Sequence, residues 1–273
     1  MPNQTITLHT GMLVPDSLVT NVNNWVQHDI TPGWLESLPA TVAHVCAKWG
    51  IELDPIMPDP YITLVLLGHS AQLGPVVIKS SPLGGEFRAE ATALDLAASE
   101  HVSRLYDVDF ERSAMVVERI VPGTQLLDVD LSDEDATRLA AEMIRSFWRP
   151  APDSTGLHPL RHWMRALFDW TPRPELIATD LVEQAQEAGA SLLARSSRSV
   201  LLHGDFQHHD LLQRSSGEWV IIDPKGLHGD PGFDFAAWMY NPPDVSERAD
   251  YLELATRRIV ICAEAWGMPE NDL

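Results

Sequence analysis

The chain has 273 residues and 45% of them are hydrophobic, which is enough for one large domain or for two lobes with a proper core. Its 19 basic and 39 acidic residues give a formal charge of −20, and so acidic a surface repels nucleic acid and anionic membranes, which we exclude as partners. Two cysteines are too few for a disulfide framework. No signal peptide and no apolar run of transmembrane length is visible in the sequence. We therefore expect a cytoplasmic protein.

The first segment with a clear pattern runs from Val19 to Ile51. Its tryptophans and aliphatic residues recur every three to four positions, which is typical of helices with one buried face. Pro32 and Pro39 lie inside this segment, and proline removes a helical hydrogen bond. We therefore predict two or three short helices rather than one long helix.

A small sheet is predicted next. The β-branched, apolar runs at Ile62–Leu67 and Val76–Lys79 predict two short strands joined by a turn that contains glycine. An amphipathic helix follows over residues 86–100, and Met115–Ile120 predicts a further strand that ends at Pro122 and Gly123. Segment Ile120–Gly123 is the best candidate for a hinge.

The second half of the chain is mostly helical. Ser132 is a natural N-cap, and the acidic residues after it favour the positive end of a helix dipole. Two short apolar runs interrupt the helices and predict strands. The predicted helices are Ser132–Trp148, His158–Trp170 and Leu181–Ala194, and the strands are Ser199–Leu202 and Trp219–Ile222.

Three carboxylates follow the ends of these two strands. Asp205 and Asp210 lie in HGDFQHHD, and Asp223 follows WVII. Neighbouring carboxylates raise each other's pKa because their negative charges repel. Such a trio persists most readily where divalent cations neutralise it, and ligands that are all oxygen suit Mg²⁺. A base, metal ligands and a phosphate clamp are what phosphoryl transfer needs. A metal-dependent hydrolase is the rival reading of a His/Asp cluster, but its HxHxDH spacing is not matched.

At residues 199–243, LLHGDFQHHDLL, WVIIDPKG and GDPGFDFAAWMYNP resemble the aminoglycoside phosphotransferases, and most of all the branch of the streptomycin 6-kinases and hydroxyurea phosphotransferases. The resemblance implies an α+β, bilobal, protein-kinase-like fold. A small N-terminal mixed α/β lobe would carry an antiparallel sheet, and a larger C-terminal lobe would be mostly helical. Residues 1–119, with the leading helices, would bind the nucleotide, and residues 120–273 would form the catalytic and acceptor-binding lobe.

The resemblance also implies roles in the second lobe. Asp205 matches the catalytic base, and His203 matches the residue that orients its loop. Asp223 and Asp210 match the two metal ligands, although the family normally has Asn at the position of Asp210. We therefore expect an altered metal affinity or a reduced rate. Asp234, like Asp230, would brace the catalytic loop by hydrogen bonds.

In the first lobe, Lys79 matches the lysine that binds the α- and β-phosphates, and Glu90 matches its acidic partner, with Glu86 as the fallback. The main chain at Glu118 and Ile120 matches the hinge that binds adenine. The turn GHSAQLG lacks the G-x-G-x-x-G pattern, so main-chain amides of the turn would have to cover the phosphates.

The function implied is an ATP-dependent O-phosphotransferase that moves the γ-phosphoryl group of Mg-ATP to a hydroxyl of a small molecule. A cationic aminoglycoside such as streptomycin, inactivated in antibiotic resistance, suits the acidic chain best. The alternatives are a kinase for another small hydroxyl-bearing metabolite on the same fold, or a weakly active or non-catalytic nucleotide-binding protein. The protein would be a monomer or a homodimer. The family usually continues by one or two helices beyond the position of Leu273. Either this protein is shorter or the end is absent from the sequence, and a reduced acceptor wall would loosen the acceptor specificity.

Overall fold

The structure is a computed structural model that describes residues 5–25, 30–55, 61–151, 156–171, 173, 175–196 and 198–268. The chain divides into two compact units, Met1–Gly123 with Gln213–Val220, and Thr124–Leu212 with Ile221–Leu273. It passes from one unit to the other within three short strands, β6 (Pro122–Gln125), β9 (Leu211–Arg214) and β10 (Trp219–Ile221). None of the helices in the described residues is long and apolar enough to span a membrane.

The first unit is built on an antiparallel sheet with the strand order β1-β2-β3-β5-β4. Alternate side chains of the central strands are buried, as the apolar, β-branched sequences require for a sheet covered by helices. A register shift interrupts the pairing of β4 with β5. The strands are β1 (Ile51–Leu53), β2 (Leu64–Ser70), β3 (Gly74–Ser80), β4 (Leu105–Asp109) and β5 (Ala114–Glu118).

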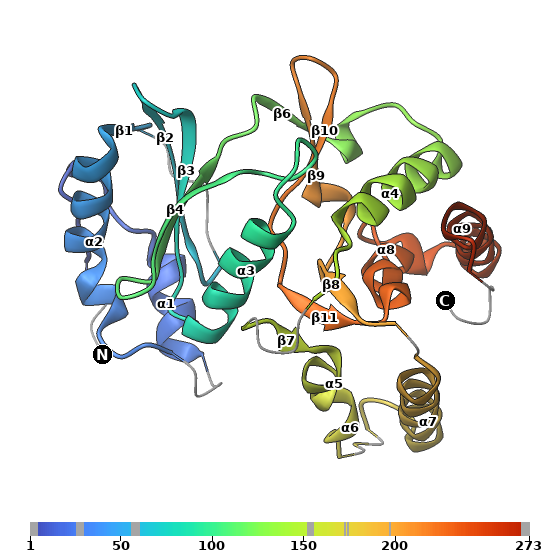
Figure 1. The fold of residues 1–273 in the computed structure, drawn as a ribbon. Coiled ribbons are helices and arrows are strands. Elements are labelled where there is room, and N and C mark those ends of the chain that lie inside the picture. Colours follow the sequence, from blue (N-terminus) through green and yellow to red (C-terminus); the bar gives the residue numbers. More distant parts are fainter. Residues whose placement is uncertain are drawn as a thin grey trace. The chain divides into compact units, whose positions relative to one another are not determined.

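Helices cover both faces of this sheet. Figure 1 shows α1 (Asp16–Asn24) and α2 (Trp34–Trp49) on one face and α3 (Gly84–Leu96) on the other. Ile78 of β3 packs in the core beneath α1 and α2, so Lys79, the next residue, points to the face that carries α3. The expectation that Pro39 interrupts a helix is wrong, because Pro39 lies inside α2.

The second unit contains the remaining helices. Ser132 caps α4, because its Oγ accepts the amide of Asp135 at 3.1 Å, as expected. The helix predicted over His158–Trp170 is instead a two-residue strand and two single-turn helices that meet at Met164. The helices are α4 (Asp133–Phe147), α5 (Leu160–Trp163), α6 (Arg165–Phe168), α7 (Thr179–Arg195), α8 (Ala236–Met239) and α9 (Tyr251–Trp266).

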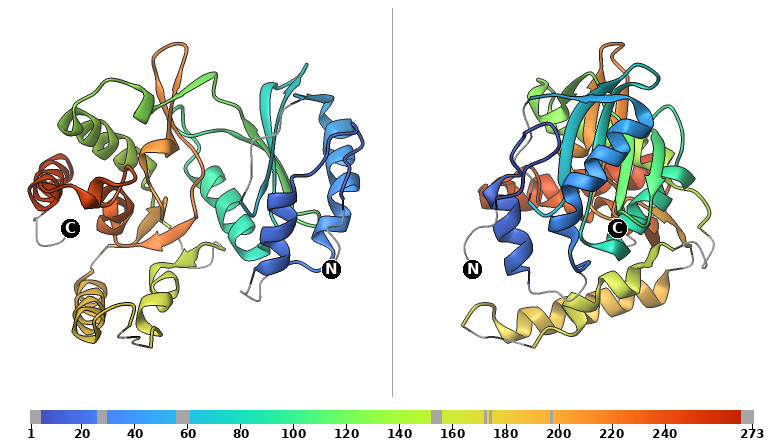
Figure 2. Two further views of the ribbon diagram at one scale, coloured as in Figure 1. Left: turned by 180° about the vertical axis from the view of Figure 1, so that it is seen from behind. Right: turned by 90° about the vertical axis from the view of Figure 1, so that its left-hand side faces the viewer.

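Short elements connect these helices. In the left view of Figure 2, α5, α6 and α7 lie together, apart from α4, α8 and α9.

A small sheet with the order β7-β11-β8 lies in the same unit. The strands are β7 (His158–Pro159), β8 (Val200–Leu202) and β11 (Leu227–Gly229), and the 3₁₀ turns are η1 (Leu126–Asp128), η2 (His208–Asp210), η3 (Pro231–Phe235) and η4 (Val245–Glu247).

The guanidinium of Arg258 joins three helices of the second unit. Arg258 lies on α9 and is fully buried. It donates to the carboxylate of Asp133 at the start of α4, and to the carbonyls of Trp238 in α8 and Asn241 just after it. A guanidinium carries five N–H donors in a fixed plane, which lets one side chain satisfy several acceptors.

Replacing Arg258 by Met should therefore lower the free energy of unfolding by about 3 kcal/mol, because the carboxylate and the carbonyls lose their buried donor. Arg257→Met is the matched control on the same helix, since Arg257 is half exposed and its nearest carboxylate oxygen is 3.9 Å away. That control should change the stability by less than about 0.5 kcal/mol. Urea unfolding measures both, and equal effects of the two substitutions would contradict the role of Arg258.

Candidate active site

The loop that carries Asp205 begins with a glycine that no other residue can replace without strain. Gly204 has φ +88°, a left-handed conformation that side chains disfavour. A Cβ atom at this position would lie 2.6 Å from Cγ of Leu227 in β11. The chain therefore turns at Gly204 directly after β8 and packs closely against β11. Asp205 is the next residue after this turn.

Asp234 of η3 anchors the same turn. Its Oδ1 accepts the amide of Gly204 at 2.7 Å, and its Oδ2 accepts the amide of His203 at 3.0 Å and the indole N–H of Trp148 at 2.9 Å. Burial raises the pKa of Asp234 to about 6, while the three donors favour the carboxylate and pull the pKa down. Asp234 thus braces the loop that carries Asp205 by hydrogen bonds, as the sequence led us to expect. Asp230 instead caps η3 by accepting the amide of Gly232.

His203 connects the loop to the segment that follows β10. Its ring is buried between Phe147 and Phe206, and its Nε2–H donates to the carbonyl of Ile222 at 2.8 Å. The carbonyl of His203 accepts the amide of Lys225 at 2.7 Å. His203 is therefore placed to position the loop from within the core.

The charges of Asp205 and Asp223 both act on the third candidate carboxylate, that of Asp210. Asp210 is buried, and burial raises its pKa well above the usual value. The negative charges of Asp223 and Asp205 raise the pKa further, whereas the amide of Gln207 and the positive charge of Lys225 lower it. Both other carboxylates that the sequence assigned to this site therefore disfavour the ionised form of Asp210.

Two backbone features fix the positions of Asp210 and Asp223. The carbonyl of Asp210 accepts the amide of Ile222 at 3.0 Å, which ties η2 to the end of β10. Asp223, the next residue, has φ +60°. A non-glycine residue in this region costs energy and is found where the surrounding structure holds it in place.

The three candidate carboxylates match the ligand preference of a hard divalent cation. The three side chains offer only oxygen atoms, which suit Mg²⁺ and not a site with nitrogen or sulfur ligands. Among the described residues, no three His, Cys, Asp or Glu side chains converge closely enough to hold an ion by themselves. Mg²⁺ usually binds through only one or two carboxylates and completes its shell with water and phosphate oxygens.

Gln207 organises the loop between Asp205 and Asp210. Its side-chain amide donates to Oδ1 of Asp205 at 2.9 Å, and its main-chain amide donates to Oδ2 of Asp210 at 2.8 Å. The Gln207 side chain in turn accepts the amide of Asp210, which completes a reciprocal cap on η2. The sequence left Gln207 unassigned, although a polar residue three positions before an acid is the signature of such a cap.

The aromatic residues around the loop divide into core and surface. His208 stacks on Trp238 with 3.7 Å between ring centroids, and burial, followed by the charge of Arg258, lowers the pKa of His208 to about 3. Trp238 is a fully buried core residue. Tyr240 is 54% exposed. Its pKa is raised, first by partial burial and second by the negative charge of Asp205.

In the first unit, Lys79 of β3 forms an ion pair with Glu90 of α3. Both side chains are mostly buried, with 11% and 13% of their surface exposed. A buried ammonium needs such a partner, because an isolated charge away from water is costly. Of the two acidic residues of α3 that the sequence offered, the structure pairs Glu90 with the lysine.

The residues that flank Ile120, Glu118 and Val121, form hydrogen bonds within the first unit. The amide of Glu118 donates to the carbonyl of Arg104 at 2.8 Å, and its carbonyl accepts from the hydroxyl of Ser103. The carboxylate of Glu118 binds Arg214, and the carbonyl of Val121 accepts an amide of the 213–220 hairpin. The carbonyl oxygen of Glu118 retains a second lone pair for another donor.

The turn between β2 and β3 is a compact hairpin. The hydroxyl of Ser70 accepts the amides of Gln72 and Leu73 at 3.2 and 3.3 Å and donates to the carbonyl of Trp49. These two amides are therefore directed at a side chain of the protein itself. The turn is not an open nest of main-chain donors of the kind that glycine-rich loops present to phosphate.

Comparison with known proteins places the chain among kinases. The sequence profile of the family described as aminoglycoside/hydroxyurea antibiotic resistance kinase matches residues 48–273. The chain is 28% identical over 241 residues to a streptomycin 6-kinase of Streptomyces glaucescens, which covers 86% of this chain and 78% of that protein. It is 27% identical over 214 residues to a hydroxyurea phosphotransferase of Kitasatospora aureofaciens, covering 76% and 62% of the two chains.

Among solved structures, an amicoumacin kinase in complex with AMP-PNP, Ca²⁺ and Ami matches with a TM-score of 0.59 and 12% identity. The match covers 85% of this chain and 79% of that one. At this identity the similarity shows the fold alone. The α+β, protein-kinase-like fold expected from the sequence is therefore confirmed.

Proposed function

Because the chain belongs to the aminoglycoside/hydroxyurea antibiotic resistance kinase family and is thus a phosphotransferase, we propose that it transfers the γ-phosphoryl group of Mg-ATP to a hydroxyl group of a small molecule. The observation that carries this proposal is the loop of Asp205 and Asp210, which Asp234 and Gln207 hold by hydrogen bonds and which the amide of Ile222 ties to the segment of Asp223. Such a loop combines a proton acceptor with ligands for a divalent cation.

Asp205 would act as the base. The side-chain amide of Gln207 holds Oδ1, and an acceptor hydroxyl would donate its proton to Oδ2. As the hydroxyl oxygen forms its bond to the γ-phosphorus, the bond from this phosphorus to the β-phosphate oxygen breaks and ADP leaves. The proton then resides on Asp205. His203 and Asp234 would contribute by fixing the loop, without touching the reacting atoms.

Asp223 and Asp210 would hold the magnesium ion, with phosphate oxygens and water completing its coordination. The bound ion supplies charge neutralisation on the β- and γ-phosphates. Asp210 brings a second full negative charge, where the family normally has a neutral Asn. Lys225, whose positive charge acts on Asp210, would offset that extra charge.

The first unit would supply the nucleotide contacts. The Lys79–Glu90 pair holds an ammonium group in a fixed place, as binding of the α- and β-phosphates requires. The main chain from Glu118 to Ile120 would bind the edge of adenine. The amicoumacin kinase with AMP-PNP and Ca²⁺ supports nucleotide and divalent-cation binding on this fold.

The acceptor we propose is a cationic aminoglycoside such as streptomycin, on account of the relative that is a streptomycin 6-kinase. The formal charge of −20 would attract such a polycation. We propose Tyr240 as an acceptor contact, because its side chain is exposed and the charge of Asp205 acts on it. The reaction would take place in the cytoplasm, in keeping with two free, buried cysteines.

Release of ADP in the presence of Mg-ATP and each member of a panel of aminoglycosides and hydroxyurea tests the proposal. We expect at least one acceptor to stimulate ADP formation. Asp205→Ala should lower kcat about 10²- to 10⁴-fold, because it removes the general base, and should leave the affinity for ATP unchanged. Asp180→Ala, which removes an exposed carboxylate at the start of α7, is the control and should keep full activity.

Two outcomes would contradict the proposal. If no acceptor stimulates ADP formation while Mg-ATP still raises the melting temperature, the protein is a non-catalytic nucleotide binder. If Asp205→Ala retains turnover with the stimulating acceptor, the base is another residue.

A double-mutant cycle tests whether Lys225 offsets the charge of Asp210. Lys225→Met should raise the KM for Mg-ATP about tenfold, because it leaves Asp210 unbalanced beside the phosphates. In the background of Asp210→Asn the same substitution should cost much less. The chain has only three lysines, and Lys48→Met at an exposed ion pair is the control. Equal effects of Lys225→Met in both backgrounds would exclude the compensation.

A further inference from the structure

Helix α7 carries an apolar stripe that is exposed to solvent. The stripe consists of four residues at intervals of four, three and four positions, Leu181, Ala185, Ala188 and Leu192. Leu181 is 58% exposed and Leu192 is 42% exposed. Because each residue turns a helix by about 100°, the four side chains leave the helix on one face. This is the spacing of the seam along which two helices pack in a coiled coil.

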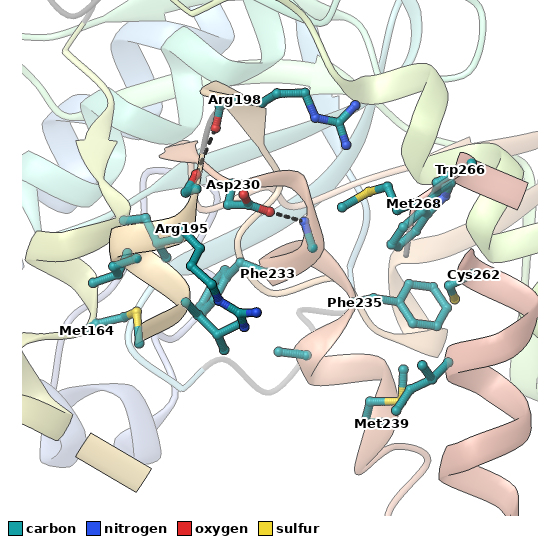
Figure 3. Close-up of a pocket in the computed structure, with 18 residues that line it drawn as sticks. Met164, Arg195, Arg198, Asp230, Phe233, Phe235, Met239, Cys262, Trp266 and Met268 are labelled. Atoms are coloured by element: carbon teal, nitrogen blue, oxygen red, sulfur yellow. Dashed lines mark hydrogen bonds between the residues drawn. The ribbon is translucent and has the colours of Figure 1, made fainter. Parts of the chain in front are cut away.

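The adjacent face of α7 is packed within the second unit. The side-chain amide of Gln186 donates to the carbonyl of Leu167 at 2.9 Å. Gly189 is buried, and a Cβ atom at this position would lie 2.9 Å from Cε of Met164. Figure 3 shows Met164 on the wall of a pocket that Leu193, one turn after Gly189, also lines. The unit therefore uses one face of α7 for its own packing and leaves the α7 stripe exposed.

A second pocket, of about 320 Å³, opens beside the first half of the stripe. It lies between α6 and α7, and both Leu181 and Ala185 line it. Trp170 and Ile177 line it as well, and both are exposed to solvent. Every described residue in its lining is apolar or aromatic. Such a pocket can accept an apolar side chain of a facing helix, as a hole accepts a knob in a coiled coil.

The α7 stripe has the same order of side chains from both ends. In either direction it is Leu, Ala, Ala and Leu with the same intervals. A twofold axis across the stripe would therefore place Leu181 against Leu192 of an antiparallel second copy, and Ala185 against Ala188. The small alanines at the centre allow the two helices to approach closely. Leu192 of the second copy would then enter the pocket beside Leu181.

The local charge permits a second copy at this surface. The formal charge of −20 makes two copies of the chain repel each other. The stretch from Leu160 to Ala194 takes little part in this repulsion, because its three arginines and five acidic residues give a formal charge of only −2. Gln184 and Ser191 flank the stripe on the side away from the packed face, and both are exposed and uncharged. Antiparallel pairing would bring Gln184 near Ser191 of the second copy, so no like charges meet beside the seam.

We propose that two copies of the chain associate through the α7 stripe as an antiparallel, twofold-symmetric dimer. This dimer does not depend on the proposed phosphotransfer. The 17 residues of α7 span about 25 Å, and one helix buries less than the roughly 800 Å² per partner of a typical stable complex. The association is therefore weak and reversible, with a Kd of about 10 μM.

Analytical ultracentrifugation over about a hundredfold range of concentration around this Kd tests the proposal. The mean mass of the unaltered chain should rise from one chain to two. Leu181→Glu should stay monomeric throughout, because it would bury a charge in an apolar seam. Its melting temperature should not change at low concentration, since Leu181 is exposed in the single chain. Leu252→Glu is the matched control, because Leu252 is a leucine of α9 that is 78% exposed, and it should dimerise like the unaltered chain.

Disulfide cross-linking tests the direction of the two helices. On oxidation, an equimolar mixture of Ala185→Cys and Ala188→Cys should form linked dimers several times faster than either variant alone, because antiparallel pairing places these two positions opposite each other. The native Cys46 and Cys262 are buried and should not contribute. Single variants that link as fast as the mixture would contradict the antiparallel arrangement.

Three results would overturn the dimer itself. The first is a chain that stays monomeric over the whole range of concentration. The second is a dimer that persists in Leu181→Glu, because another surface would then form it. The third is a monomeric chain that co-sediments with phosphatidylcholine vesicles unless Leu181 is replaced by Glu, because the stripe would then bind a membrane.

Discussion

The buried carboxylate of Asp234 is the interaction on which the candidate active site depends. It accepts the amides of His203 and Gly204 and the indole of Trp148, and thereby holds the turn that leads into Asp205. Burial without these donors would be costly, because burial raises the pKa of Asp234 to about 6 even though the three donors favour the carboxylate. Any change that removes this acceptor leaves buried amides without a partner and releases the loop.

Charge balance is the second constraint on the site. Asp210 is buried, and the charges of two other carboxylates disfavour its ionised form. A bound cation, protonation of Asp210 or the positive charge of Lys225 would each reduce this repulsion. A neutral Asn at this position would need none of these. The positive charge of Lys225 lowers the pKa of Asp210 and so acts against the two carboxylates.

Local patterns in the sequence predicted much of this arrangement. The apolar runs indicated β2 and β3, the N-cap at Ser132 indicated α4, and the motifs around Asp205 indicated the site. Interactions between distant residues left no local signal. Examples are the return of the 213–220 hairpin to the first unit, where Arg214 binds Glu118, and the stacking of His208 on Trp238. Short strands such as β11 were also missed, because three residues carry too little periodicity to be recognised.

The hold of Asp234 on the catalytic loop is tested most directly by hydrogen exchange at the amides of His203 and Gly204. In the unaltered protein both amides should exchange slowly, because each donates to the buried carboxylate. In Asp234→Ala they should exchange faster by a much larger factor than the amide of Ile144, which lies in the core of α4. An equal acceleration at all three amides, or none at the loop, would contradict the central role of Asp234.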